Sequence, residues 1–346
     1  MSLYRRLRSN LLIAVAIVGL VSAVHANTSD SVRTVDVTFQ SLETQLTGKL
    51  ALPTQATKRR FPAVLLVAGS DHGADAKFGI ARAPRKAFEE LAVELAKKGI
   101  ASFRYDNRCS GASKCKPEST LQDHNEDAVA AFKMLARRAE IDPARIVVIG
   151  HDEGGIFASH VAATVTAPTK VSGLVTIGMP GRVYHKILRE QEQKRLVEEG
   201  KSPAEVNDYL DQFDRLTVAI TSGSADATQL KIDRNDPIFK PILGNVIYFF
   251  NQFQTDPLQV IRGVQAPVLL VQGEKDALVE VKDANYLNEM LRGQYNADYT
   301  MKTFPEMDHW MRVQKGPATL TIDESTRPLD PAFLSALSDW LAKRFK

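Results

Sequence analysis

The chain has 346 residues, of which 44% are hydrophobic and 25% are charged, as is ordinary for a soluble globular protein. Its formal net charge of +3 is too small to indicate a nucleic acid or an anionic membrane as the partner. The length suits one large domain, or one domain with an insertion, and allows a full hydrophobic core.

The first 26 residues have the organisation of a secretory signal peptide. Three arginines within the first eight residues form a positive start, and residues 11–24 are almost entirely apolar but short for a membrane span. Residues 24–26, Val-His-Ala, match an A-x-A-like cleavage site. We therefore expect cleavage after Ala26, no stable membrane span afterwards, and a periplasmic or secreted protein. An uncleaved membrane anchor is the alternative.

The elements that follow alternate between strands and helices. Residues 35–39 and 46–52 alternate apolar and polar side chains, which predicts an antiparallel strand pair ending at Pro53. The continuous apolar run at residues 63–67 predicts a strand buried on both faces, as in a parallel sheet. The further predicted segments are a helix at 87–98, a strand at 100–103, a helix at 125–138, a strand at 145–149, a helix at 153–163, a strand at 171–177, and renewed alternation at 268–271, 286–291, 299–304 and 331–345.

This alternation predicts an α/β fold with a mainly parallel central sheet and helices on both faces. Residues 181–263 interrupt it, being long, polar and helical in character at residues 186–199 and 203–213. An insertion of this length with its own secondary structure predicts a helical lid rather than a loop. We therefore predict a core made of residues 27–180 and 264–346.

The most informative segment is Ile-Gly-His-Asp-Glu-Gly-Gly at residues 149–155, between a predicted strand and a predicted helix. A nucleophile flanked by small residues at such a turn is typical of a nucleophile elbow. Glycine at positions 150 and 154 keeps the tight, strained turn free of clashes. The residue at the apex, directed into the site at the top of the sheet, is Asp152.

Four further segments, together with this elbow, occur in the chain order of one protein family. They are Val67-Ala68-Gly69-Ser70, Phe103 to Arg108 with Gly111 and Ser113, Gly273-Glu274-Lys275-Asp276, and Met307-Asp308-His309. They are similar to the oxyanion-hole loop, the arginine-and-glycine loop, the acid loop and the histidine loop of one family. With the elbow and the leading hairpin, nearly the whole mature chain resembles α/β-hydrolases of the esterase, dienelactone-hydrolase and serine-aminopeptidase type.

The resemblance implies the α/β-hydrolase fold and a triad of nucleophile Asp152, acid Asp276 and histidine His309, in the chain order of that fold. It also implies an oxyanion hole formed by the backbone N–H groups of Ser70 and Glu153. Glu274 is a near neighbour that could replace Asp276 as the acid.

The family carries serine at the apex, whereas this chain carries Asp152. A carboxylate, with a reference pKa of about 3.9, attacks without a base. Attack on an ester carbonyl would give a reactive anhydride, but attack on a saturated carbon gives an alkyl ester that water activated by His309 would hydrolyse. Asp276 would orient the imidazole. This favours epoxides or alkyl halides, although Glu153 fits poorly, because epoxide hydrolases and haloalkane dehalogenases usually carry an apolar residue there.

Three hypotheses therefore remain open. The first is a hydrolase with a covalent Asp152 intermediate, the second an esterase in which Asp152 acts other than as a covalent nucleophile, and the third a non-catalytic binding member of the fold. Epoxide opening would need acidic groups over the site, and the candidates are Tyr184, Tyr209 and Tyr248, for which packing is the alternative role. We expect His72 to line the pocket mouth and His151 to be structural.

The only two cysteines, Cys109 and Cys115, are expected to form a disulfide in an oxidising compartment, with two free thiols as the alternative. Two cysteines without a nearby histidine do not fill a zinc shell, so no metal site is expected. No cofactor is expected either, because there is no phosphate-binding glycine loop. The predicted partner is a small-molecule substrate, and the oligomeric state is left open.

Overall fold

The structure is a computed structural model that describes residues 27–29, 32–54, 60–70, 85–114, 119–223, 230–293, 296–319 and 327–346. The expected signal peptide, His72 and Cys115 lie outside these residues. Within them, no helix has the length and apolar character needed to cross a bilayer. The same ranges contain no group of three or more His, Cys, Asp or Glu side chains arranged to hold a metal ion.

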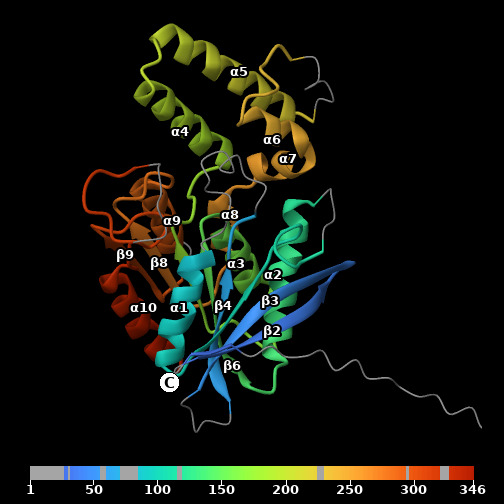
Figure 1. The fold of residues 1–346 in the computed structure, drawn as a ribbon, viewed down its shortest axis with the longest axis vertical. Coiled ribbons are helices and arrows are strands. Elements are labelled where there is room, and N and C mark those ends of the chain that lie inside the picture. Colours follow the sequence, from blue (N-terminus) through green and yellow to red (C-terminus); the bar gives the residue numbers. More distant parts are fainter. Residues whose placement is uncertain are drawn as a thin grey trace, which may run out of the picture.

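A nine-stranded sheet forms the centre of the described part of the chain (Figure 1). Its strands are β1 (Asn27–Ser29), β2 (Val32–Ser41), β3 (Thr44–Pro53), β4 (Phe61–Val67), β5 (Ala101–Tyr105), β6 (Ile141–His151), β7 (Gly173–Ile177), β8 (Val268–Gly273) and β9 (Tyr299–Phe304). They lie in the order β1-β2-β3-β5-β4-β6-β7-β8-β9. The first three strands are antiparallel to their neighbours, and β5, β4, β6, β7, β8 and β9 are parallel. The predicted hairpin and parallel sheet are both present.

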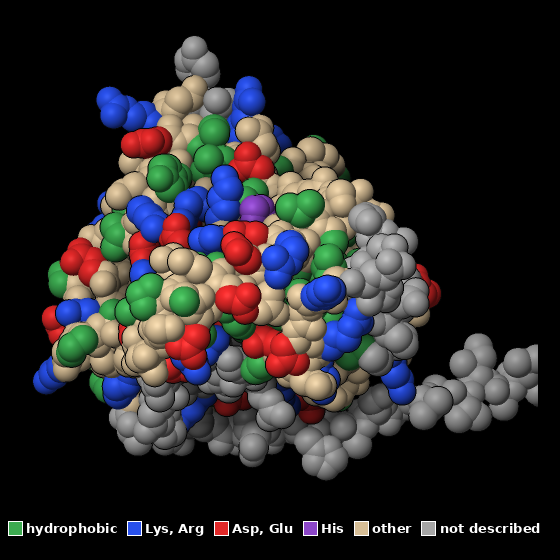
Figure 2. Space-filling model, turned by 90° about the horizontal axis from the view of Figure 1, so that it is seen from above, with side chains coloured by type: hydrophobic (Ala, Val, Ile, Leu, Met, Phe, Trp, Pro, Cys, Tyr) green, Lys and Arg blue, Asp and Glu red, His purple; other side chains and the backbone are tan. Residues whose placement is uncertain are grey.

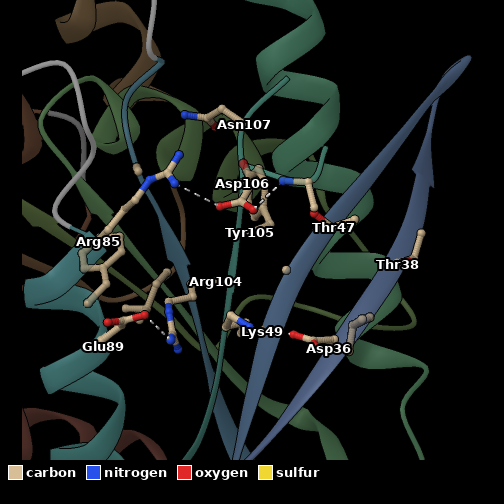
Figure 3. Close-up of a pocket in the computed structure, with 16 residues that line it drawn as sticks. Asp36, Thr38, Thr47, Lys49, Arg85, Glu89, Arg104, Tyr105, Asp106 and Asn107 are labelled. Carbon is tan, nitrogen blue, oxygen red and sulfur yellow. Dashed lines mark hydrogen bonds and ion pairs between the residues drawn. The ribbon is translucent and has the colours of Figure 1, made fainter. Parts of the chain in front are cut away.

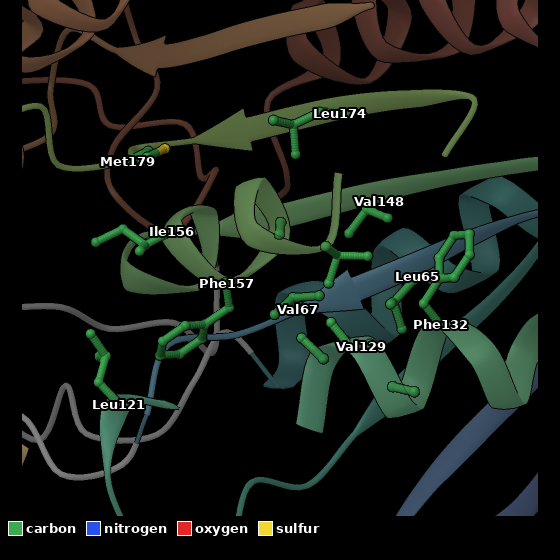
Figure 4. Packing of buried hydrophobic residues seen from close by; sticks show 14 of the residues in the cluster. Leu65, Val67, Leu121, Val129, Phe132, Val148, Ile156, Phe157, Leu174 and Met179 are labelled. Carbon is green, nitrogen blue, oxygen red and sulfur yellow. The ribbon is translucent and has the colours of Figure 1, made fainter. Parts of the chain in front are cut away.

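Helices cover both faces of the sheet. Helices α1 (Arg85–Lys97) and α10 (Pro331–Arg344) pack on one face, and α2 (Leu121–Ala136), α3 (Glu153–Thr164), α8 (Pro257–Arg262) and α9 (Val281–Gly293) on the other. Successive side chains of β4 point alternately to the helices on one face of the sheet and to those on the other. Leu65 and Val67 join the α2 and α3 side chains (Figure 4), whereas Val64 and Leu66 join those of α1 and α10. This explains the uninterrupted apolar run of that strand.

Helix α2 begins four residues before its predicted start at position 125. The hydroxyl of Thr120 accepts a hydrogen bond from the backbone N–H of Asp123 (3.1 Å), and the Asp123 carboxylate accepts one from the Thr120 N–H (2.8 Å). This reciprocal capping box satisfies N–H groups that a helix start otherwise leaves unpaired. The polar first turn therefore extends the helix beyond its apolar pattern.

The insertion after β7 contains α4 (Tyr184–Glu198), α5 (Pro203–Thr221), α6 (Phe239–Gly244) and α7 (Val246–Gln254), and α8 leads back to the sheet. Because it leaves from the carboxyl end of β7, it stands over that edge of the sheet, at the top of Figure 1. Helix α5 extends beyond its predicted end at residue 213 to Thr221, because Leu216 and Ile220 continue its buried face. Seen from above in Figure 2, charges of both signs are interspersed on this end of the molecule.

Candidate active site

The predicted elbow is a strained strand-to-helix turn. Asp152 follows β6 directly, precedes α3, and has φ 54° and ψ −129°, a backbone conformation that non-glycine residues rarely adopt. Its N–H donates to the carbonyl of Ile177 (2.9 Å), and its carbonyl accepts from the N–H of Gly155 (2.8 Å). These bonds hold the backbone at the apex, where the Asp152 side chain is partly exposed.

Both predicted elbow glycines lie against backbone atoms that leave no space for a side chain. A Cβ atom at Gly150 would lie 2.2 Å from the carbonyl oxygen of Gly154, and one at Gly154 would lie 2.3 Å from that of Val67. Real Cβ contacts are never so short. The glycines thus allow the elbow to pack onto itself and onto the end of β4, where the predicted oxyanion loop begins.

The acid and histidine loops meet as a buried pair. The Nδ1 atom of His309 lies 2.9 Å from Oδ2 of Asp276, and the two residues are 4% and 6% exposed. The other Asp276 oxygen accepts two N–H bonds from its own loop, two and three residues further along (2.9 and 2.8 Å). Glu274, the alternative acid, is exposed and accepts a bond from Thr303 instead. The Nδ1 contact leaves Nε2 as the nitrogen suited to act as a base.

The end of β7 connects the elbow with this pair. Ile177 accepts the Asp152 N–H, and the next residue, Gly178, packs against the acid and the histidine. A Cβ atom at Gly178 would lie 3.0 Å from the nearer Asp276 oxygen and 3.6 Å from Nδ1 of His309. The structure therefore brings the three predicted triad residues to one place at the carboxyl edge of the sheet.

His151, next to the apex, is a buried structural residue. Its Nε2 atom lies 2.6 Å from the carbonyl oxygen of His309, and its ring stacks on Trp310 with centroids 5.6 Å apart. Burial, followed by the nearby His309, lowers the pKa of His151 to about 3. The imidazole is neutral near pH 7, so Nε2 carries the proton that it donates to His309.

The Ser70 N–H group is placed differently from the prediction. It donates to Oε2 of Glu153 (2.8 Å), and the Ser70 hydroxyl donates to the same oxygen (2.7 Å). In the structure this N–H is therefore engaged by a protein carboxylate, and its role as a donor to a substrate oxyanion stays a prediction. The other predicted donor, the N–H of Glu153, lies at the start of α3 beside the apex.

Tyr248 of α7 reaches the same carboxylate. Its hydroxyl donates to Oε1 of Glu153 and lies 2.6 Å from the Ser70 hydroxyl oxygen. Burial, and then the Glu153 carboxylate, hold the pKa of Tyr248 well above its ordinary value. Tyr248 is thus a neutral donor at the elbow, and its proton is directed to a protein carboxylate.

The other two candidate tyrosines occupy different places. Tyr209 donates to Glu192 (3.0 Å) and Asp236 (3.1 Å) inside the insertion, which gives it a structural role away from the elbow. Tyr184 begins α4 and packs against Phe253 of α7, with ring centroids 6.3 Å apart.

Two supporting amides were not predicted. Gln272 is fully buried, and its Nε2 atom lies 2.8 Å from the carbonyl of Val279 and 3.3 Å from Oδ2 of Asp276, so it braces the acid loop. The Nδ2 atom of Asn107 donates to the carbonyl of Gly69 (2.5 Å) and braces the start of the oxyanion loop. A polar residue at the end of an otherwise apolar strand was the available signal for Gln272.

The arginine-and-glycine loop is held by an internal ion pair. Arg108 is 1% exposed and donates two hydrogen bonds to Asp127 (2.7 and 2.8 Å) and one to Thr44 (2.9 Å). Cys109, the next residue, has φ 62°, in the left-handed region that glycine adopts without strain. Because Cys115 is not among the described residues, the disulfide stays a prediction.

A cavity of about 480 Å³ lies behind the oxyanion loop, between α1 and strands β2, β3 and β5 (Figure 3). Asn107 marks its upper end. Three acidic and three basic side chains line it and pair with each other, so their formal charges cancel: Arg85 with Asp106 (3.8 Å), Arg104 with Glu89 (3.1 Å) and Lys49 with Asp36 (2.8 Å).

Known proteins agree with this architecture. Esterase EstD of Thermotoga maritima is 26% identical over an aligned region of 305 residues. The match covers 86% of this chain and 66% of EstD, so the chain spans just under two thirds of that relative. An esterase of Pyrococcus furiosus superposes with a TM-score of 0.54 at 17% identity, covering 90% of each chain. Acetyl xylan esterase 1 of a Thermoanaerobacterium species gives 0.55 at 12% identity, covering 94% of this chain and 88% of the esterase. These two likenesses confirm the predicted fold.

The family assignment rests on a family model rather than on the structural likenesses. The model described as serine aminopeptidase, S33, matches residues 84–313, which are more than half of the chain and include the elbow, the acid loop and the histidine loop. This chain therefore belongs to the serine aminopeptidase S33 family, within the α/β-hydrolase superfamily.

Proposed function

We propose that this hydrolase acts on a small electrophilic substrate through a covalent ester on Asp152, with His309 and Asp276 completing a catalytic triad. The observation that carries the proposal is the Asp152 carboxyl group at the apex of the strained elbow, beside a hydrogen-bonded Asp276–His309 pair. The Asp276–His309 hydrogen bond supports the proposal, because hydrolysis of an ester on Asp152 needs a base that is held in one orientation. We therefore treat Asp152 as a working nucleophile.

In the first step, an Asp152 oxygen attacks a saturated carbon of an epoxide or alkyl halide. The new carbon–oxygen bond forms as the bond to the leaving oxygen or halide breaks, and the leaving atom takes the electron pair. No proton leaves Asp152, because an ordinary aspartate carboxyl group is already ionised near neutral pH. An opened epoxide gains its proton from water, whereas a halide needs none.

In the second step, His309 removes a proton from water, and the resulting hydroxide attacks the carbonyl carbon of the Asp152 ester. Asp276 stabilises the imidazolium that forms, and the N–H of Glu153 is the donor nearest in sequence to the developing oxyanion. The acyl carbon–oxygen bond then breaks, and the proton on His309 passes to the departing alkoxide. The products are an alcohol and the Asp152 carboxylic acid, which releases its remaining proton to water and so regenerates the carboxylate.

Ester hydrolysis in which Asp152 acts other than as a covalent nucleophile is the second candidate function. The observation that favours it is the similarity to esterase EstD over 86% of this chain. Here Asp152 would take a proton from water, which attacks the substrate carbonyl directly. A third candidate, binding without catalysis, predicts no turnover of either substrate class by the wild-type chain.

Isotope labelling separates these functions. Enzyme in molar excess is mixed with an aryl epoxide, a bromoalkane or an aryl ester in H₂¹⁸O for a single turnover, and both the product and the peptide that contains Asp152 are weighed. The covalent route places ¹⁸O in that peptide and leaves the alcohol oxygen that came from Asp152 unlabelled. General-base hydrolysis labels the acid product and leaves the peptide at its original mass.

Three variants complete the experiment. His309→Gln should accumulate the alkyl-enzyme, and Asp152→Ala should lose both turnover and labelling. Asp152→Ser tests the binding hypothesis, since ester turnover confined to this variant would show that the natural site has given up hydrolysis. An unlabelled Asp152 peptide after a confirmed turnover would exclude the covalent route.

We also propose that the protein is exported and that Cys109 pairs with Cys115. The support is the charge and apolar pattern of residues 1–26 and the oxidising compartment that export implies. N-terminal sequencing of the protein from a periplasmic or culture fraction should begin at Asn27. Peptide mass mapping without a reductant should show both cysteines joined, and alkylation of either one would contradict the pairing.

A further inference from the structure

The side chain of Glu153 is a buried carboxyl group held by four neutral donors. Oε2 accepts from the Ser70 N–H (2.8 Å) and hydroxyl (2.7 Å), and Oε1 accepts from Nε2 of Gln252 (2.7 Å) and from the Tyr248 hydroxyl. Glu153 is only 7% exposed, and none of these partners carries a positive charge. Its place in the first turn of α3 adds the favourable end of the helix dipole.

These hydrogen bonds join three parts of the molecule that are distant in sequence. Ser70 and Glu153 are 83 residues apart, and Tyr248 and Gln252 lie a further 95 and 99 residues along the chain from Glu153. The carboxylate thus connects the oxyanion loop, the elbow helix and α7 of the insertion. It does so at the residue that directly follows Asp152.

A second connection holds the insertion at its entrance. Arg182 makes two hydrogen bonds to the buried carboxylate of Asp283 at the start of α9 (2.9 and 2.8 Å), and Gln191 of α4 donates to the carbonyl of Leu278 (2.9 Å). This connection fixes α4 to the acid loop. Helix α7 is held partly by apolar packing of Tyr248, Phe249 and Phe253 in the core, and the Glu153 cluster adds a polar connection that ends beside the nucleophile.

We propose that Glu153 is a positioning residue that holds helix α7 and the oxyanion loop against the elbow, so that the pocket over Asp152 has its working shape. The inference rests on the function proposed for Asp152. Without the carboxylate, four donors lose their common acceptor, and a buried donor left unpaired costs about 1–3 kcal/mol. Helix α7 would then shift, and a misplacement of about 1 Å near reacting groups costs about 100-fold in rate.

The test is Glu153→Ala combined with rescue by formate. The variant should form the alkyl-enzyme about 10- to 100-fold more slowly per unit of substrate, with KM raised. Formate is a carboxylate small enough to occupy the vacated space and receive the same donors. Added formate should restore much of this rate, whereas chloride at equal ionic strength should not. Glu153→Leu fills the volume without an acceptor and should stay slow with or without formate.

Two tyrosine variants provide a matched comparison. Tyr248→Phe removes one of the four donors and should weaken formate rescue when combined with Glu153→Ala. Tyr209→Phe removes a partly buried hydroxyl that bonds Glu192 and Asp236 inside the insertion. It should lower stability without changing formate rescue. If the insertion were only loosened in general, both tyrosine substitutions would change formate rescue of Glu153→Ala by the same amount.

Melting temperatures test the inference separately from the proposed function. Formate should raise the melting temperature of Glu153→Ala more than that of the wild type, whatever reaction the site performs. Absence of an alkyl-enzyme in His309→Gln would overturn the Asp152 route, not the anion site. Equal formate effects in the wild type and Glu153→Ala, or full activity in Glu153→Leu, would overturn the positioning role.

Discussion

Two buried carboxylates flank Asp152, and they are held in opposite ways. Asp276, with His309, forms the histidine side of the site, where two of its four hydrogen bonds come from the backbone of its own loop. Glu153, with Ser70, forms the oxyanion side, where two of the donors come from a helix of the insertion. The histidine side is therefore a property of the core, whereas the oxyanion side depends on where the insertion docks.

The largest expected effect is on the histidine side. Asp276→Asn should lower kcat by about 10⁴-fold, because an amide no longer holds His309 in the tautomer whose Nε2 acts as the base. In the covalent route only the second step needs that base. The alkyl-enzyme should therefore form at nearly the wild-type rate and persist, as measured by intact-protein mass after rapid quenching.

Glu274→Gln is the control for that variant, since Glu274 is exposed and bonds Thr303 rather than His309. It should retain the wild-type kcat. Equal losses in Glu274→Gln and Asp276→Asn would mean that the loop as a whole, and not the Asp276–His309 hydrogen bond, sustains the reaction.

The histidine side and the elbow were predictable because local sequence determines them. The glycines at 150 and 154 follow from contacts within one turn and against one strand end. Asp276 is fixed by N–H groups two and three residues away, and His309 follows the last parallel strand. Each of these features can be predicted once the order of strands and helices has been predicted correctly.

The oxyanion side could not be predicted in the same way. The partner of the Ser70 N–H is a side chain 83 residues away, and that side chain is itself directed by Tyr248, 95 residues beyond it. The docking position of α7 depends on packing across the insertion, which no local pattern records. The sequence indicated only that position 153 is an acid where an apolar residue would suit a known aspartate mechanism.

The next expected effect is on stability and concerns the buried Arg108–Asp127 ion pair, which lies behind the oxyanion side. Asp127→Asn should lower the free energy of unfolding by about 3–5 kcal/mol, because it leaves the buried Arg108 guanidinium without its main counter-charge. Asp36→Asn, in an exposed pair with Lys49, should change it by less than about 0.5 kcal/mol. Urea unfolding of both variants measures the difference, and equal midpoints would show that the Arg108 pair adds no net stability.

Two glutamines allow the sides to be compared with the same substitution. Gln272→Leu, on the histidine side, and Gln252→Leu, on the oxyanion side, each remove a buried amide donor, and each should cost about 1–3 kcal/mol in unfolding free energy. They should differ in kinetics. Gln272→Leu should slow decay of the alkyl-enzyme, which needs His309, whereas Gln252→Leu should slow its formation. Gln212→Leu, at an exposed bond to Asp208, is the control.

The last expected effect is a pH dependence of stability at His151, which lies where the two sides meet. Burial lowers its pKa in the folded protein to about 3, whereas an exposed histidine titrates near 6.5. Between these pH values the unfolded chain binds a proton that the folded chain does not. Its contribution to stability is therefore complete above about pH 6.5 and is lost as the pH falls toward 3, by at most about 1.4 kcal/mol per pH unit.

His151→Gln isolates this contribution from that of the carboxylates. Glutamine keeps an N–H group that can donate to the carbonyl of His309 but does not titrate, while the other ionisable groups remain in both proteins. The difference in unfolding free energy between wild type and variant, measured by urea unfolding from pH 7.5 to 4, should shrink or reverse as the pH falls. Parallel curves would mean that the folded protein protonates His151 as readily as the unfolded chain does, and a neutral imidazole would then not be what supports the backbone of His309.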